Sequence, residues 1–317
     1  MNQPAESAAY SEDLGPLRAE LASLATERSN PDFQLLDTMS TSELVAAMNG
    51  QDALVAAAVS KSLGQIAQAV DAVTQKLAAG GRLIYTGAGT AGRIGVLDAS
   101  ECPPTFGTPA EMVVGVIAGG SRAVQHAVEN AEDNVEAGAA DLHALKLNKN
   151  DAVIGISASG RTPYVLGALA AAREVGAFSA AIACNTGSAI GQAADVAIEV
   201  EVGPEFVTGS TRLKSGTAQK LVVNMISTLS MVKLGKTYGN LMVDLQATNA
   251  KLRARSQRTV QQATGVDADQ AANALEAADG SVKLAILLLL TGVTPDAGRA
   301  ALGQANGFLR EAITKTR

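Results

Sequence analysis

Short apolar runs alternate with longer segments of helical periodicity through the middle of the chain. The predicted strands are the apolar runs at 82–86, 112–117, 152–156, 179–183 and 196–201. They are rich in β-branched residues and show no polar face, which is typical of parallel strands covered on both sides. The pattern predicts an α/β fold, with a doubly wound and mostly parallel five-stranded sheet over residues 51–240.

The predicted helices lie between these strands and before the first one. Apolar residues at helical spacing run from Leu54 to Leu77, and the pattern ends at Gly80-Gly81, so a helix leads into the first strand. Further helices are predicted at 91–100, 121–145, 163–176 and 212–234. Ligands of such folds bind at the carboxyl ends of the strands, so we expect a site in the loops there.

Two flanking regions have a different pattern. Residues 1–50 form a predicted N-terminal arm, which is polar and Ala-rich to residue 25 and then carries turn and cap signals at Asn30-Pro31 and at Ser42 before Glu43. Residues 241–317 are a predicted helical region, with helices at 240–263, 267–278, 281–291 and 295–314. Thr294 before Pro295 predicts an N-cap. We expect a small three-helix module over about residues 265–317.

Composition and charge narrow the class of protein. The 317 residues carry a formal net charge of −6, which argues against a nucleic-acid partner, because nucleic acids bind basic faces. The longest aliphatic stretch, 284–290, is too short to span a bilayer. Cys102 and Cys184 lack metal-type spacing, and no signal peptide is apparent at the N-terminus. We therefore expect a cytoplasmic protein without a disulfide, a metal or a membrane contact.

Three loops rich in Gly, Ser and Thr each precede a predicted helix, at 86–90, 157–163 and 208–211. Backbone N–H groups and hydroxyls at helix N-termini suit an anion, most often a phosphate. Arg93 and Lys214 are the charge partners nearby, although a solvated position explains either equally well. The candidate ligand-binding residues are Thr86, Gly87, Gly89, Thr90, Arg93, Ser157, Ser159, Gly160, Arg161, Thr162, Ser210, Thr211 and Lys214.

The first of these loops also fits the dinucleotide pattern G-x-G-x-x-G over 87–92. That pattern requires an acidic residue at the end of the next strand to hold a ribose. The strand ends instead in Ile117-Ala118-Gly119-Gly120, which disfavours a nucleotide. A P-loop is excluded, because no Gly-Lys-Ser/Thr follows a Gly-rich loop.

Carboxylates are the main candidates for proton transfer. The two histidines, His126 and His143, fall in the predicted helix 121–145, away from any nucleophile, so Ser-His and Cys-His catalysis have no support. Glu101 is expected just past a helix, beside Pro103-Pro104 in mostly apolar surroundings that would raise its pKa. Glu132 borders an apolar helical stripe, and taken alone it is better explained as a surface glutamate.

Long blocks of the sequence resemble the N-acetylmuramic acid 6-phosphate etherase family. The most specific blocks are Asp-Ala-Ser-Glu-Cys-Pro-Pro-Thr-Phe at 98–106 and Gly-Ser-Thr-Arg-Leu-Lys-Ser-Gly-Thr at 209–217. Shorter matches lie at 26–31, 36–37, 87–95, 131–133 and 157–163. The resemblance runs from about residue 26 to the end of the chain and does not cover the first 25 residues.

This resemblance implies a sugar isomerase (SIS) domain that binds sugar phosphates, works as a homodimer and needs no cofactor. It implies cleavage of the lactyl ether at C3 of the sugar, giving N-acetylglucosamine 6-phosphate and D-lactate in amino-sugar catabolism and peptidoglycan recycling. Glu101 matches the acid that protonates the departing lactate. Glu132 matches the second catalytic glutamate, expected to act as the base at C2. The three loops and both glutamates would then belong to one site.

Two alternatives share the same fold. A sugar-phosphate sensor, as in the related glucokinase regulatory protein, would keep the loops without needing both glutamates. An aldose–ketose isomerase would abstract the C2 proton without elimination. The presence of both Glu101 and Glu132 favours the etherase, and only the etherase is expected to release lactate.

Overall fold

The computed structural model describes residues 15–245, 247 and 249–316 of the chain. Its centre is a five-stranded sheet of order β2-β1-β3-β4-β5, in which all neighbours pair in parallel. The strands are β1 (Leu83–Gly87), β2 (Val113–Ile117), β3 (Ala152–Ser157), β4 (Phe178–Ala183) and β5 (Val196–Glu199). The predicted doubly wound α/β class and all five predicted strands are confirmed.

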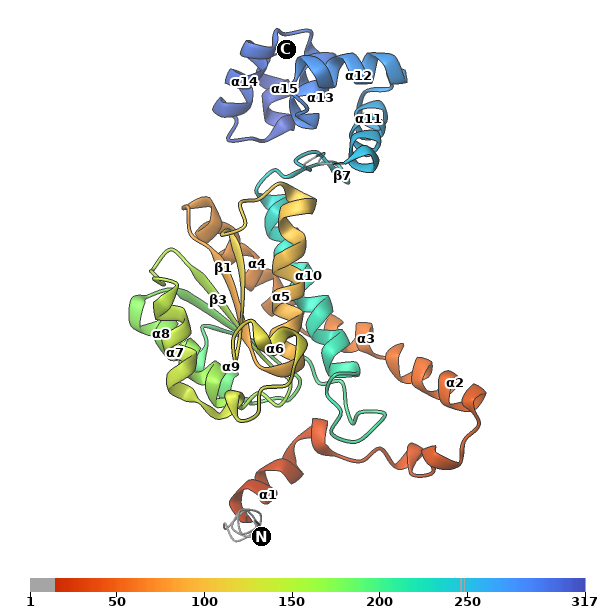
Figure 1. The fold of residues 1–317 in the computed structure, drawn as a ribbon, viewed down its shortest axis with the longest axis vertical. Helices are drawn as coiled ribbons and strands as arrows, with labels where there is room; N and C mark the ends of the chain where they lie inside the picture. The colour runs from red at the N-terminus through yellow and green to blue at the C-terminus, as the bar shows by residue number, and fades with distance from the viewer. Residues whose placement is uncertain (1–14, 246, 248, 317) are drawn as a thin grey trace, which may run out of the picture.

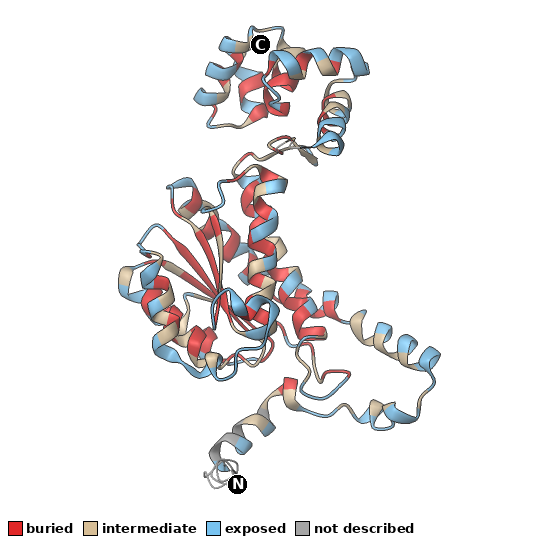
Figure 2. Cartoon of the chain, viewed as in Figure 1, coloured by how far each residue is buried: buried red, intermediate tan, exposed pale blue. Residues whose placement is uncertain are grey.

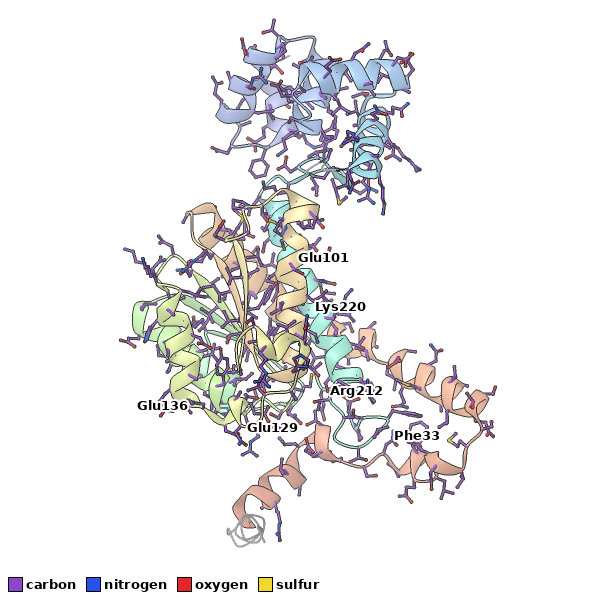
Figure 3. The ribbon with its side chains drawn as sticks, in the orientation of Figure 1. Phe33, Glu101, Glu129, Glu136, Arg212 and Lys220 are labelled. Atoms are coloured by element: carbon purple, nitrogen blue, oxygen red, sulfur yellow. The ribbon has the colours of Figure 1, made fainter. Side chains whose placement is uncertain are left out.

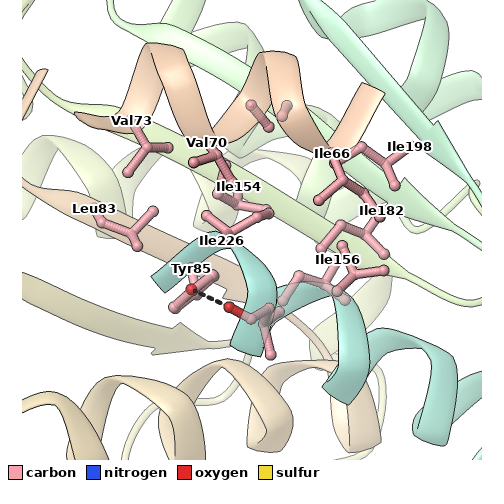
Figure 4. Close-up of a cluster of buried hydrophobic side chains, with 14 of the residues drawn as sticks. Ile66, Val70, Val73, Leu83, Tyr85, Ile154, Ile156, Ile182, Ile198 and Ile226 are labelled. Carbon is pink, nitrogen blue, oxygen red and sulfur yellow. Dashed lines mark hydrogen bonds between the residues drawn. The ribbon is translucent and has the colours of Figure 1, made fainter. Parts of the chain in front are cut away.

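Helices cover both faces of the sheet (Figure 1). On one face lie α4 (Leu63–Ala78), α5 (Gly89–Phe106) and α10 (Lys214–Lys233), and on the other α7 (Val135–Ala144), α8 (Pro163–Val175) and α9 (Ala189–Ala193). Successive strand residues point to opposite faces, so Leu83 and Tyr85 pack with α4 and α10, whereas Ile84 packs with α7 and α8. Figure 4 shows the first of these cores, where Ile66 and Val70 of α4 meet Ile154 and Ile226.

Several predicted helices have different bounds in the structure. The helix expected near 54–80 is divided into α3 (Val55–Ser60) and α4. The helix expected at 121–145 is wrong: the chain there forms α6 (Arg122–Gln125), a 3₁₀ turn η4 (Ala131–Asp133) and α7. The helix expected at 91–100 continues to Phe106. Those at 163–176 and 212–234 correspond to α8 and α10.

The N-terminal arm contains more regular structure than the sequence indicated. Residues 1–14 lie outside the described residues; after them come α1 (Gly15–Ser23), the 3₁₀ turns η1 (Ala25–Glu27), η2 (Pro31–Phe33) and η3 (Leu36–Thr38), and α2 (Thr41–Asp52). The cap of α2 is Ser40 in a capping box with Glu43, rather than Ser42. None of the residues of α2 is buried, and Figure 2 shows this helix projecting from the sheet domain with exposed and intermediate residues only.

After α10, a hairpin of β6 (Thr237–Tyr238) and β7 (Leu241–Met242) leads to α11 (Ala250–Thr264), α12 (Ala268–Ala277), α13 (Val282–Thr291), α14 (Pro295–Gln304) and α15 (Leu309–Thr316). The helix expected at 240–263 therefore begins later, and the one at 295–314 is two helices. The Thr294 N-cap is confirmed, since its side chain accepts a hydrogen bond from the Ala297 N–H. These helices share a core of their own.

No single helix in the described part of the chain is long and apolar enough to cross a membrane. Two bent pairs pass the same test by length and composition, namely Thr41–Ser60 with Leu63–Ala78 and Val282–Thr291 with Pro295–Gln304.

Candidate functional site

The loops after β1 and β3 meet the start of α10 around one cavity at the carboxyl edge of the sheet. This first cavity has a volume of about 160 Å³. Of the predicted binding residues, Gly89, Thr90, Ser157, Ser159, Thr162 and Thr211 line it, together with Glu132. The structure therefore brings residues of all three Gly/Ser/Thr loops to one place, as expected of parallel strands whose carboxyl ends share an edge.

The loop after β3 gathers hydroxyl groups at the N-terminus of α8. The Oγ of Ser157 lies 2.7 Å from the Oγ1 of Thr162 and 3.2 Å from the Oγ of Ser159, and it accepts a hydrogen bond from the Gly160 N–H. Pro163 is the first helical residue, where the helix was expected to begin, and Thr162 is the N-cap residue, although its side chain does not cap the helix. Its hydroxyl is thus held among hydroxyls that can turn toward an anion.

The loop after β1 leads directly into α5, with Ala88 as N-cap residue and Gly89 at a φ of +53°. Gly92 lets the first turn of α5 lie against the strand, because a Cβ there would come within 2.6 Å of the Gly87 carbonyl oxygen. The N-terminus of this long helix therefore faces the first cavity, where its N–H groups and dipole favour a negative charge.

Glu132 lies in η4 rather than on a helix surface. The preceding Asn130 has a φ of +59°, which ends any helical course there, and Val124 and Val128 of the expected apolar stripe are 37% exposed. Glu132 lines both the first cavity and a neighbouring one of about 170 Å³ that also includes Arg93. Arg93 donates through Nε to the Val124 carbonyl oxygen, so it fixes this loop beside the cavity.

Glu101 does not line the first cavity. It is inside α5, not past it, and its side chain is exposed, so the apolar enclosure expected from the sequence is absent here. It lines a separate cavity of about 480 Å³ with Asp98, Thr105 and Asn224. Glu101 lies about 18 Å along the helix axis from Gly89, at the usual rise of about 1.5 Å per residue. Figure 3 shows Glu101 well away from Glu129 of the η4 loop.

A buried polar cluster lies behind Glu101. Asp98 accepts hydrogen bonds through Oδ1 from the Asn224 amide at 2.6 Å and the Ser227 hydroxyl at 3.1 Å. Burial raises the pKa of Asp98, against the hydrogen bonds that favour its charged form. The cluster joins α5 to α10 beneath the larger cavity.

The other predicted binding residues do not line the first cavity. Thr86 and Gly87 are buried at the end of β1, and Gly160 and Arg161 belong to the loop backbone around Ser157. The Ser210 N–H donates to the Val207 carbonyl oxygen in a turn. Lys214 is buried, donates through Nζ to Gln51, and has its pKa lowered by that burial. It therefore ties α10 to the arm.

Sequence reasoning missed two polar residues that line the first cavity, Glu27 of the arm and Gln219 of α10. Glu27 falls in the matched block 26–31, which was the available signal for it. Gln219 lies two residues past the most specific part of the second block, 209–217, in the stretch to 220 that also resembles the family. Among the described residues, no group of three or more His, Cys, Asp or Glu side chains is arranged to hold a metal ion.

Comparison with known proteins shows which families this chain resembles. A model of the glucokinase regulatory protein N-terminal SIS domain matches residues 65–173, and the SIS domain model matches 120–229. An N-acetylmuramic acid 6-phosphate etherase of Pectobacterium atrosepticum is 58% identical over 293 residues, covering 92% of this chain and 97% of that protein. One from Streptomyces coelicolor is 55% identical over 297 residues, covering 94% and 96%.

Among solved structures, the phosphoheptose isomerase GmhA of Neisseria gonorrhoeae has a TM-score of 0.46 at 21% identity, over 60% of this chain and 98% of that one. Fold and family models together define a SIS-domain protein. The identities over nearly the full length go further: the chain belongs to the N-acetylmuramic acid 6-phosphate etherase family.

Proposed function

We propose that this chain is a carbon–oxygen lyase that cleaves the lactyl ether at C3 of N-acetylmuramic acid 6-phosphate. The products are N-acetylglucosamine 6-phosphate and D-lactate, and the role is amino-sugar catabolism in peptidoglycan recycling. The observation that supports this most directly is one cavity lined jointly by anion-binding loops and Glu132. Family relatives named for the same activity support it independently.

The phosphate is assigned to the hydroxyl cluster of Ser157, Ser159 and Thr162, at the N-termini of α5 and α8. Hydroxyls and helix N–H groups bind a dianion without a buried countercharge. Anchoring the phosphate in this way holds the reacting carbons in place, so that binding energy remote from the reaction lowers its barrier.

The reaction begins from the open-chain aldehyde, in which the carbonyl acidifies the proton on C2. Glu132 removes this proton, and Glu101 protonates the C3 oxygen as lactate leaves, which gives an unsaturated aldehyde. Water then adds at C3 and gives a proton to Glu101, while Glu132 returns a proton to C2. The protons balance over the cycle, so two carboxylates suffice.

The proposal includes a homodimer in which a partner subunit supplies Glu101. Within one chain Glu101 and Glu132 line separate cavities, whereas the reaction needs both on adjacent carbons. Apolar side chains near Glu101 are exposed, namely Leu97, one turn earlier in α5, at 51% and Val232 of α10, which lines the same cavity as Glu101, at 41%. Such a patch is typical of an interface. A cytoplasmic location belongs to the same proposal, since a charged sugar phosphate does not cross a bilayer unaided.

The reaction is tested by proton NMR of the purified protein with N-acetylmuramic acid 6-phosphate in D₂O. We expect release of lactate and deuterium at C2 of the sugar product. Exchange at C2 without lactate would indicate an isomerase-like site, and saturable binding without any change in the sugar would indicate a sensor.

Glu101→Gln tests the role of the acid. We expect lactate release to fall by about 10²- to 10⁴-fold, the usual contribution of a general acid, while exchange at C2 continues. Glu132→Gln is the matched variant, and it should abolish exchange and release together. Normal turnover by Glu101→Gln would remove the acid from the mechanism.

Mixing these two inactive variants tests the shared site. If Glu101 and Glu132 act from different subunits, each mixed dimer contains one site with both native glutamates. Random exchange of subunits should then restore about one quarter of the native activity. No recovery after verified exchange would place both residues in one subunit.

A further inference from the structure

The N-terminal arm is anchored directly at the candidate site. Asn185 lies just after the carboxyl end of β4. Its Oδ1 accepts hydrogen bonds from the N–H groups of Ala25 at 2.7 Å and Thr26 at 3.4 Å. Its Nδ2 donates to the Thr26 hydroxyl at 3.0 Å and to the Ala158 carbonyl oxygen at 3.1 Å. Asn185 and Thr26 are both buried. One amide therefore fixes η1 of the arm to the loop after β3.

This anchor places Glu27 in the first cavity. The residue follows the buried Thr26, and its carboxylate lies 3.4 Å from where a Cβ of Gly209 would be. A second contact holds the arm nearby, because the ring of Phe33 packs edge-on against Phe206 with centroids 4.9 Å apart. Among the described residues none donates a hydrogen bond to the Glu27 carboxylate. Its position is thus set by the arm, and its acceptor atoms remain available.

A carboxylate is unexpected in a cavity suited to a phosphate. The negative charges of a carboxylate and a phosphate in one small cavity repel each other, so Glu27 disfavours binding of the phosphate group itself. An ionised carboxylate can only accept hydrogen bonds. It therefore matches a part of the ligand that carries a hydroxyl or an amide N–H.

Gln219 contributes a hydrogen-bond donor to the same cavity, whereas Glu27 contributes acceptors. The residue is only 1% exposed, and its Nε2 has no hydrogen-bond partner among the described residues. An unpaired buried donor is costly, so a ligand acceptor at this position would remove an existing penalty. Glu27 and Gln219 together suit a group that both donates and accepts, such as a sugar hydroxyl or an acetamido group.

We propose that Glu27 and Gln219 are positioning residues that recognise the sugar part of the ligand, while the Ser/Thr loops hold its phosphate. The inference rests on the proposed function and adds to it a substrate-reading role for the N-terminal arm. The ligand class is a phosphorylated sugar with a hydroxyl or amide group within reach of both side chains.

The test compares two probes by calorimetry, inorganic phosphate and N-acetylglucosamine 6-phosphate. In Glu27→Ala we expect the sugar phosphate to bind roughly tenfold more weakly, from the loss of a charge-assisted hydrogen bond. Inorganic phosphate should bind equally or more tightly, because a repelling charge is gone. Weaker binding of both probes to the same extent would show a merely structural role and overturn the proposal.

Further variants sharpen this result. Gln219→Met, of similar length but without the amide, should also weaken binding of the sugar phosphate, and the double variant should lose less than the product of the two single losses, because both side chains read one group. Glu136→Gln is the control, since it removes an exposed charge from the first turn of α7 outside the first cavity, and it should bind both probes like the native protein. If the losses of binding free energy in the two single variants add fully in the double variant, the two side chains do not bind one common group of the ligand.

Lactate release by the native protein separates this inference from the proposed function. If native turnover is present and Glu27→Ala binds the sugar phosphate normally, the inference fails and the etherase reading stands. If the native protein releases no lactate, the proposed function fails whatever the variants bind.

Discussion

At the scale of single residues, two glycines with positive φ differ in what surrounds them. Gly107, the C-cap residue of α5, has a φ of +61°, and a Cβ there would lie 2.1 Å from the Asp244 carbonyl oxygen. Gly80 has a φ of +80°, but no atom lies within 4 Å of such a Cβ. Both positions favour glycine for their backbone conformation, and only Gly107 is also needed for close approach of another segment.

Gly107→Ala is therefore expected to cost more stability than Gly80→Ala. The left-handed conformation costs a non-glycine residue about 1 kcal/mol, and at Gly107 the clash with Asp244 adds roughly 1–3 kcal/mol of main-chain displacement. Urea unfolding of both variants measures the difference in the free energy of unfolding. Equal losses would show that the approach of Asp244 to α5 contributes nothing to stability.

Site residues could be predicted where the neighbouring sequence alone indicates their role. The Gly/Ser/Thr loops were found because their composition itself indicates an anion-binding turn. Glu27 was not, because it reaches the cavity through Asn185, which bonds a residue 159 positions away. Glu101 was misplaced for a related reason: its apolar neighbours Cys102 and Phe106 are buried, but adjacent residues of a helix point in different directions.

At the scale of elements, Asp151 joins the beginnings of β1 and β3. Its buried carboxylate accepts hydrogen bonds from the Arg82 guanidinium at 2.6 Å, from the Arg82 N–H at 3.0 Å and from the Asn148 N–H at 3.0 Å. Burial alone would raise the pKa of Asp151, but the hydrogen bonds from Arg82 and Asn148 hold it below its ordinary value. The Arg82–Asp151 ion pair therefore fixes the amino ends of β1 and β3, at the end of the sheet opposite the site.

Asp151→Ala should lower the free energy of unfolding by about 3 kcal/mol at neutral pH, as expected when one partner of a buried ion pair is removed. Because the folded-state pKa is lowered, this contribution is complete above the unfolded-state pKa of about 3.9 and is lost as the pH falls through the folded-state value. The native and variant proteins should thus converge in acid.

Urea unfolding between pH 3 and 7 measures this convergence. Asp71→Ala is a suitable control, because Asp71 pairs with Lys233 on the surface with both side chains more than half exposed, and such pairs contribute at most about 1 kcal/mol. A difference between native and Asp151→Ala proteins that stays constant with pH would contradict the assignment.

Helix boundaries were the least predictable feature at this scale. The expected helix 121–145 followed a periodic set of valines that the structure leaves exposed, whereas the true start of α7 is marked by Asn134, whose side chain accepts from the Ala137 N–H. Asn134 is a common N-cap residue, but the expectation for this segment followed apolar periodicity alone. Conversely, α5 continues through Pro103 and Pro104, where prolines usually predict an end.

At the scale of the whole molecule, the sheet domain and the C-terminal helices have separate cores joined by a few contacts. Asp244 pairs with Lys236 at 3.1 Å and with Lys283 of α13 at 2.8 Å, and the Arg310 guanidinium lies 5.1 Å from the centre of the Tyr238 ring. The fold class was predictable because each strand carries its own pattern. The attachment of the helical region was not, because it depends on single pairs between distant residues.

These contacts lead to a prediction for a chain that ends at residue 264. Without α12 to α15, Val243 and Val260 would lose the core that buries them, and the β6–β7 hairpin would lose its support from Arg310. Residues 237, 239, 240 and 242 of this hairpin segment line the cavity of Glu101. We therefore expect lactate release to fall on the order of 10²-fold, as for a displaced catalytic group, while inorganic phosphate still binds in the first cavity.

Lys283→Ala in the full chain is the graded comparison, since it removes one attachment and keeps the core of the helical region, and a smaller loss of activity is expected. Lactate release and phosphate binding, measured on the same preparations, distinguish a loosened Glu101 from general unfolding, which would abolish both. Native activity and native dimerisation by the shortened chain would show that the helical region has no part in holding Glu101. Loss of release with binding intact would mean that this region holds Glu101 in place for the phosphate-binding cavity of the partner subunit.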